Sequence, residues 1–222
     1  MRRVVKVGGS LLNLADLPQR LRKWSELQKP GVNLFVVGGG GIVEAMRELD
    51  AIHEFEPAQV HWWCVQLLST SAVLLSSLVP EWQLLQTDLE VTSALGEHFD
   101  KNANRNTSFI LDTGRLFGVE EDRRKVEAHC SQGVQEGTVQ LPEDWSTTTD
   151  SIAAWLCCRF AADELVLLKS IDVMGCDWDS HAQSGFVDRA FPKIAAQVTR
   201  IRVVNLRSVQ WSPVSGTSTG QR

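Results

Sequence analysis

The chain has 222 residues, of which 43% are hydrophobic and 22% charged, and its formal net charge is −5 at pH 7. This length suits one large α/β domain with a substantial core, and the acidic balance argues against general binding to nucleic acid or to an anionic membrane. The longest apolar stretch, around residues 57–80, is interrupted by Gln, His, Ser and Thr, so we expect neither a transmembrane span nor a signal peptide. The five cysteines are odd in number and lack CxxC or zinc-ligand spacing, which predicts reduced thiols and a cytoplasmic location.

The first element is an apolar strand, residues 4–7, that carries Lys6 and ends in Gly8, Gly9 and Ser10. Two glycines let backbone N–H groups approach an anion without obstruction, and the helix start that follows adds its dipole at the same place. Turns of this kind are common in α/β proteins. By itself, this stretch therefore favours a plain turn over a phosphate site.

A second strand ends in a similar turn. Residues 15–29 carry apolar side chains at helical spacing (Leu17, Leu21, Trp24 and Leu27) and predict a crossover helix. The strand at residues 33–37 then runs into four glycines, 38–41, which precede an amphipathic helix at residues 42–49. We therefore expect these glycines at a helix N-terminus, where anions are favoured.

The glycine run does not match a dinucleotide fingerprint. Gly38 and Gly40 fit its first two positions, but Val43 occupies the third, and no strand ending in an acidic residue follows about twenty residues later. No Gly-Lys-Ser/Thr closes the loop as in a Walker motif. An α/β oxidoreductase is thus a distant alternative.

The middle of the chain predicts a long helix at residues 57–79 that contains His61, Trp62 and Trp63. Short strands are expected near residues 83–85 and 108–111, with a polar loop at 97–106 between them. The sequence predicts a charged helix or a solvated loop at residues 118–129.

Residues 144–160 predict an amphipathic helix whose first turn contains Thr147, Thr148, Thr149, Asp150 and Ser151. One interpretation makes Thr147 the N-cap and Asp150 its capping-box partner. The other takes the crowded hydroxyls and carboxylate as a turn that organises phosphate and metal. The residue pattern leaves both interpretations open.

The last third predicts a buried strand at residues 163–169, which ends at Lys169 and is followed by a loop with Asp172 and Gly175. Such strand ends form the edge where α/β proteins bind ligands. A further helix has Pro192 and Lys193 in its first turn, and a final strand follows at residues 201–206.

Four segments stand in a characteristic order: VVKVGGS, FVVGGGG, TTTDSIAAWL, and FPKIAAQ followed by VVNL. This order resembles the amino-acid-kinase superfamily, which includes carbamate, acetylglutamate, uridylate and isopentenyl phosphate kinases. The resemblance implies an α/β fold, a three-layer αβα sandwich around a mostly parallel sheet. It also implies one domain at residues 1–208 and a flexible tail at 209–222.

Within the superfamily, the patterns Trp-x-x-Thr-x-Asp-Ser and Val-Asp-x-x-Phe-Pro-Lys are similar to those of the archaeal-type kinase that phosphorylates (aminomethyl)furanmethyl phosphate in methanofuran biosynthesis. The resemblance implies transfer of the γ-phosphoryl group of ATP, with Mg²⁺, to a phosphate monoester to give a diphosphate. It also implies a homo-oligomer, with a dimer favoured.

The same resemblance assigns roles to residues. Lys6 and Lys193 would contact the transferring phosphoryl group, and Asp150 would orient the two lysines. The remaining assignments are phosphate and nucleotide binding by Gly8, Gly9, Ser10, Lys169, Asp172 and Gly175, and acceptor binding by Gly38, Gly39, Gly40, Gly41 and His61. No protein ligand to a metal is assigned.

Three departures from the family pattern stand out. The nucleotide loop, commonly Thr-Asp-Val-Asp-Gly, reads Ile-Asp-Val-Met-Gly at residues 171–175, and the Gly-Gly-Met segment before the second lysine is absent. The Gly-Gly-Gly-Ser-Phe-Gly-His signature of isopentenyl phosphate kinases is also absent, which disfavours an isoprenoid acceptor. The alternatives are a uridylate-type nucleoside monophosphate kinase and, because of Met174, a non-catalytic anion- or nucleotide-binding protein on the same scaffold.

Overall fold

The computed structural model describes residues 1–97, 105–118, 139–173, 175 and 177–208. The predicted flexible tail, most of the charged segment at 118–129, and Met174 lie outside the described residues. The described cysteines Cys64, Cys157 and Cys158 carry free thiols. No helix among the described residues is both long enough and apolar enough to cross a membrane.

Six parallel strands form one sheet in the order β3-β4-β2-β1-β5-β6. Their bounds are β1 Arg2–Val7, β2 Gly31–Val37, β3 Gln83–Leu85, β4 Asn106–Leu111, β5 Glu164–Lys169 and β6 Ile201–Asn205. β1, β2 and β5 are buried along almost their whole length, as expected for strands covered on both faces. These are the apolar runs that predicted strands.

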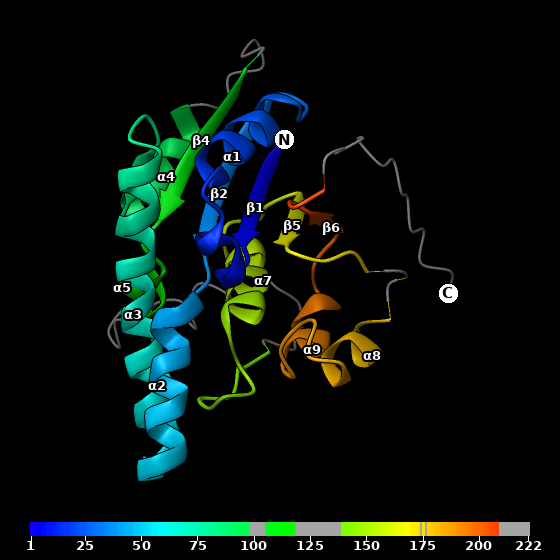
Figure 1. The fold of residues 1–222 in the computed structure, drawn as a ribbon. Helices are drawn as coiled ribbons and strands as arrows, with labels where there is room; N and C mark the ends of the chain where they lie inside the picture. Colours follow the sequence, from blue (N-terminus) through cyan, green and yellow to red (C-terminus); the bar gives the residue numbers. More distant parts are fainter. Residues whose placement is uncertain (98–104, 119–138, 174, 176, 209–222) are drawn as a thin grey trace.

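Helices cover both faces of the sheet, so the predicted three-layer αβα arrangement is confirmed (Figure 1). Their bounds are η1 Gly9–Asn13, α1 Leu17–Glu26, α2 Gly40–His53, α3 Pro57–Leu78, α4 Asp88–Glu97, α5 Thr113–Gly118, α7 Thr149–Arg159, α8 Trp178–Gln183 and α9 Phe191–Ala195. Helix α1 packs on the face that carries Val5 and Phe35, and α7 packs on the opposite face, which carries Val4 and Leu34. This alternation follows from the two-residue period of a strand.

The predicted apolar faces of two helices are wrong in part. Helix α1 ends at Glu26, so Leu27 lies beyond it and is 54% exposed. Helix α2 has no buried residue, and its Leu49 and Ile52 are 46% and 71% exposed. The reason is position, because α2 extends past the end of the sheet alongside α3 (Figure 1).

A row of polar side chains crosses the α1 face of the sheet near the amino ends of the strands. Glu164 on β5 is buried and forms ion pairs with Arg3 on β1 at 3.4 Å and with Arg202 on β6 at 3.0 Å. Arg3 also donates to Asn33 on β2 at 3.1 Å. This row ties four neighbouring strands together at the edge opposite to the one that carries the glycine turns.

Candidate active site

Three loops meet at the carboxyl edge of the sheet, because β2, β1 and β5 are adjacent and parallel. The Gly8 amide donates to the Leu168 carbonyl at 2.8 Å, and the Gly38 amide donates to the Val7 carbonyl at 2.9 Å. Both glycine turns and the loop after β5 therefore start side by side, as the sequence predicts.

The two glycine turns touch backbone to backbone. A Cβ atom on Gly9 would lie 2.3 Å from the Gly40 nitrogen, and one on Gly38 would lie 2.7 Å from the Gly9 nitrogen. Gly40 also has a φ of +54°, which disfavours other residues. At these three positions, glycine is therefore needed mainly because the two turns contact each other through their backbones.

Only one of the two turns leads directly into an α-helix. Helix α2 begins at Gly40, so the amides of its first turn lack intrahelical partners and favour an anion. The turn after β1 instead enters η1, a five-residue 3₁₀ helix, and α1 starts only at Leu17. The predicted helix dipole behind Gly8 and Gly9 is therefore wrong, and the α2 N-terminus provides the dipole.

Asp150 joins two lysines at the centre of this edge. Its Oδ1 lies 2.9 Å from Lys6 Nζ, and its Oδ2 lies 2.9 Å from Lys169 Nζ. Lys169 also donates to the Phe186 carbonyl at 2.6 Å. The Lys6 and Asp150 side chains are buried, and that of Lys169 is 11% exposed.

This arrangement perturbs the titration of the lysine–carboxylate cluster. Burial, followed by the Lys6 charge, lowers the pKa of Lys169 against the opposing effect of Asp150, so that this pKa is about 8. Burial would raise the pKa of Asp150, but the charges of Lys6 and Lys169 outweigh it and hold that pKa below its ordinary value. Lys6, Lys169 and Asp150 together carry a formal charge of +1 when all are ionised, which suits an anionic ligand.

The partner of Asp150 differs from the prediction. The resemblance paired Asp150 with Lys6 and Lys193, whereas Asp150 contacts Lys6 and Lys169. Lys193 is exposed on the short helix α9, and none of the ion pairs formed within the described parts of the chain joins it to Asp150. Lys169 was assigned to nucleotide binding, and its contact with Asp150 places it in the cluster with Lys6.

The first turn of α7 also differs from the capping-box interpretation. The N-cap is Thr148 rather than Thr147, and its side chain does not cap the helix. The carboxylate of Asp150 is committed to lysines and does not cap Thr147. The Thr147 hydroxyl is buried and finds no hydrogen-bond partner within the described structure.

The loop after β5 carries the residues assigned to nucleotide binding. Asp172 accepts a hydrogen bond from the Asn205 side chain of β6 at 2.9 Å. Gly175 has a φ of +83° and open space where a Cβ atom would stand. Ser10 and Ser170 hydroxyls lie 3.1 Å apart and connect this loop to the first glycine turn.

His61 lies in the first part of α3, beside the second glycine turn. It is buried, and its Nδ1 lies 3.3 Å from the Asp144 carbonyl. His61 and Gly39 of the turn line a common cavity of about 40 Å³. The lining is mostly apolar and includes Gly39, Val43, His61, Trp145, Thr147 and Ile152.

A larger cavity of about 560 Å³ opens beside the lysine–carboxylate cluster, within the usual size range of small-molecule sites. Asp150 and Lys169 line it together with Arg47 of α2 and Arg189 of the loop before α9. The sequence analysis did not single out either arginine. The sequence contains one indication for Arg47, because this residue lies one to two turns into the helix that follows the glycines.

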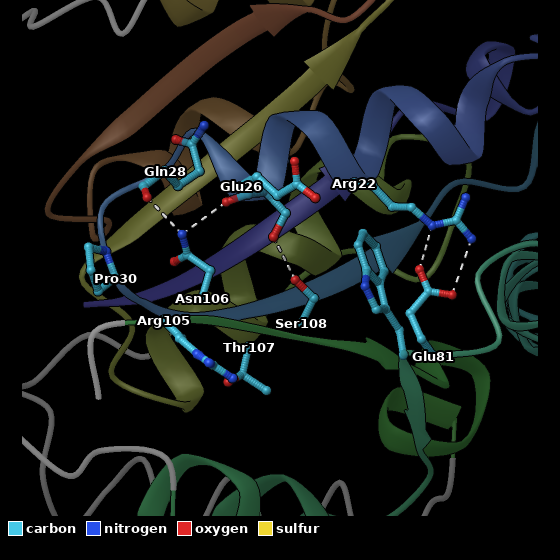
Figure 2. Close-up of a pocket in the computed structure, with 11 residues that line it drawn as sticks. Arg22, Glu26, Gln28, Pro30, Glu81, Arg105, Asn106, Thr107 and Ser108 are labelled. Atoms are coloured by element: carbon cyan, nitrogen blue, oxygen red, sulfur yellow. Dashed lines mark hydrogen bonds and ion pairs between the residues drawn. The ribbon is translucent and has the colours of Figure 1, made fainter. Parts of the chain in front are cut away.

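A second large cavity, of about 610 Å³, lies far from these residues, between the end of α1 and the start of β4 (Figure 2). Its polar groups largely satisfy one another. Arg22 pairs with Glu81, and the Ser25 and Ser108 hydroxyls lie 2.8 Å apart. Nothing in this cavity corresponds to a predicted site residue.

Solved structures of other proteins have the same fold as this chain. The uridylate kinase from Archaeoglobus fulgidus superposes with a TM-score of 0.52 at 14% identity, over 89% of this chain and 88% of the other. The UMP kinase from Ureaplasma parvum gives 0.56 at 13% identity, over 94% and 91%. The UMP kinase from Bacillus anthracis gives 0.59 at 12% identity, over 94% and 88%.

Identities this low establish the fold alone, and no curated protein sequence matches the chain. The family assignment comes from the sequence of residues 1–185, which matches the amino acid kinase family. This match covers both glycine turns, Lys6, Asp150 and Lys169. The chain therefore belongs to the amino acid kinase family, and it is a small-molecule phosphotransferase.

Proposed function

We propose that this kinase transfers the γ-phosphoryl group of ATP to a phosphate monoester, (aminomethyl)furanmethyl phosphate, and forms a diphosphate for methanofuran-type cofactor biosynthesis. The observation that carries the transfer chemistry is Asp150, which holds Lys6 and Lys169 beside two touching glycine turns. Both substrates are anions, and this edge of the sheet concentrates positive charge and free amides.

The proposed mechanism is direct transfer without a phosphoenzyme. Phosphoryl transfer requires in-line positioning and neutralisation of charge on the equatorial oxygens, and little covalent help from the protein. Lys6 and Lys169 would provide the charge, and Asp150 would hold their ammonium groups in place. The amides at the α2 N-terminus, from Gly40 onward, would bind the acceptor phosphate.

The small cavity beside His61 supports a compact acceptor. A volume of about 40 Å³ holds roughly three water molecules at 10–15 Å³ each. This space suits a five-membered ring better than a base with its ribose. The lining offers apolar groups such as Val43 and Ile152, with the unpartnered Thr147 hydroxyl as one polar contact.

A uridylate-type kinase is the second candidate, and the solved structures favour it. All three similar structures are uridylate or UMP kinases. A uracil ring with its ribose is larger than the cavity of about 40 Å³ beside His61. This difference is why we place the furan phosphate first.

ATP would occupy the larger cavity, with its triphosphate toward Lys169 and its base toward the loop of Asp172 and Gly175. The described residues hold no cluster of three or more His, Cys, Asp or Glu side chains suited to a metal. Mg²⁺ in kinase sites is commonly bound through substrate phosphates with one or two carboxylates, so we expect it to enter with ATP.

Product analysis separates the two acceptors. The protein is incubated with Mg-ATP and either (aminomethyl)furanmethyl phosphate or UMP, and diphosphate formation is followed by ³¹P NMR. We expect a higher kcat/KM for the furan phosphate. A higher kcat/KM for UMP would overturn the proposed acceptor and leave the phosphotransferase assignment intact.

We also propose a homodimer in the cytoplasm. Exposed apolar side chains on α2 and α3, including Ile52 and Val73, support self-association. Light scattering of the purified protein tests this, and a monomer at all concentrations would contradict it.

A further inference from the structure

Asp188 accepts an unusual number of hydrogen bonds for one carboxylate. Its Oδ2 accepts from the Thr148 amide and hydroxyl, both at 2.9 Å, and from the Ser151 amide at 3.0 Å. Its Oδ1 accepts from the Ser151 hydroxyl and from the Phe191 amide at 3.0 Å. One side chain thus joins the start of α7 to the start of α9.

These contacts make Asp188 the cap of a helix to which it does not belong. The first amides of an α-helix lack intrahelical partners and are normally satisfied by an N-cap side chain. Thr148, the N-cap of α7, does not do this with its own side chain. Asp188, 37 residues further along the chain from Ser151, takes the role.

The capped turn is the one that carries Asp150. Thr148 and Ser151 lie on either side of Asp150 in the sequence, and Asp188 binds both. Two residues before Asp188, the Phe186 carbonyl accepts from Lys169. The segment 186–188 therefore restrains both ends of the Asp150–Lys169 ion pair.

We propose that Asp188 is a positioning residue for phosphoryl transfer: it fixes the first turn of α7 so that Asp150 stays between Lys6 and Lys169. Among the contacts described above, Asp188 forms no hydrogen bond or ion pair with either lysine, so it positions them through Asp150; its charge also raises the pKa of Lys169, and it lines the larger cavity. This inference rests on the phosphotransferase activity of the family and is independent of the acceptor proposed.

Asp188→Asn tests the inference at nearly constant size. The amide keeps one oxygen acceptor but turns an NH₂ group toward N–H donors that need an acceptor. We expect the single-turnover transfer rate to fall about a hundredfold, the loss typical of a displacement of about 1 Å in a catalytic group. The loss of rate should exceed any change in the Kd for Mg-ATP, which is measured separately because Asp188 lines the larger cavity, since a positioning defect acts mainly on the transition state.

Lysine labelling reports the geometry without any acceptor. Ligand-free protein is treated briefly with acetic anhydride, and modified lysines are quantified by mass spectrometry. In Asp188→Asn, labelling of Lys6 should increase relative to wild type, while exposed Lys29, near the amino ends of the strands, serves as an internal reference. If the wild type phosphorylates neither acceptor, the proposed function fails, and the labelling still decides the role of Asp188.

Glu90→Gln is the matched control, since the Glu90 carboxylate accepts from the Gln86 and Thr87 amides at the start of α4. This variant loses a carboxylate cap beside β3, which lies three strands away from β1 in the sheet, and should keep the wild-type rate and labelling. A folded Asp188→Asn protein with wild-type rate and labelling would overturn the inference. If Asp188→Asn does not fold, Ser151→Ala removes one donor to the same carboxylate. We expect about a tenfold lower rate and increased Lys6 labelling, and wild-type behaviour would overturn the inference equally.

Discussion

We predict that the titration of Lys169 makes the activity of this kinase sensitive to alkaline pH. Burial and the neighbouring Lys6 charge lower the pKa of Lys169 to about 8, against the opposing charges of Asp150 and Asp188. Lys169 must carry its proton to neutralise a phosphoryl oxygen. Transfer should therefore weaken as the pH rises through about 8.

The magnitude follows from the titration curve. With a pKa of about 8, roughly one-tenth of the molecules keep the Lys169 charge at pH 9, so kcat/KM for Mg-ATP should fall about tenfold from its plateau. An unshifted lysine with a pKa of 10.5 would lose only about 3% of its charge at the same pH. The charged fraction of Lys169 at pH 9 thus differs about tenfold between the two cases.

The assay measures kcat/KM for Mg-ATP between pH 6 and 10, because this ratio reports the pKa values of the free enzyme. The chain has no tyrosine, and burial raises the pKa of Cys64 to about 11 and that of Cys157 to about 12.

Lys169→Arg is the matched control, because a guanidinium stays charged over the whole range. Any activity that this variant retains should lack the alkaline limb near pH 8. A wild-type profile that stays flat to pH 10, or a Lys169→Arg profile with the same limb, would refute this account of the cluster.

Three further substitutions test separate parts of the structure. Asp150→Asn leaves two buried cations without their shared anion, so the single-turnover transfer rate should fall at least about a hundredfold. The free energy of unfolding, measured in a denaturation series, should fall by about 3–5 kcal/mol. A near-normal transfer rate would contradict the positioning role of Asp150. Gly9→Ala places a methyl group 2.3 Å from the Gly40 nitrogen, so calorimetry should show a marked drop in Tm and weaker binding of Mg-ATP. Gly41→Ala meets open space and should change both quantities only a little. Glu164→Gln removes the charge that binds three guanidinium groups at the opposite edge of the sheet, so urea denaturation should show that the free energy of unfolding falls by about 3–5 kcal/mol. The folded protein should keep the wild-type kcat, and a specific loss of kcat would show that this edge matters for catalysis.

The strands and both glycine turns follow from local chemistry. The runs that became β1, β2 and β5 are apolar enough to be buried on both faces, and the helices between them require parallel pairing. Parallel strands bring their carboxyl ends to one edge, so Lys6 and the residues after β2 and β5 had to meet there. The exposed face of α2 did not follow, because a helix that projects past the sheet keeps an amphipathic pattern without a core to bury it.

The sequence by itself predicted that Lys6 and two glycine turns share one edge, because each stands at the end of a strand, and the family resemblance added Asp150 to them. The tertiary structure alone decided which lysine Asp150 binds. The strand order puts β5 directly beside β1, so Lys169 reaches the same carboxylate as Lys6, while Lys193 lies exposed on α9. It also decided that Asp188 caps α7 from a distance, since capping rules describe only neighbours along the chain and cannot find a partner that the fold brings there.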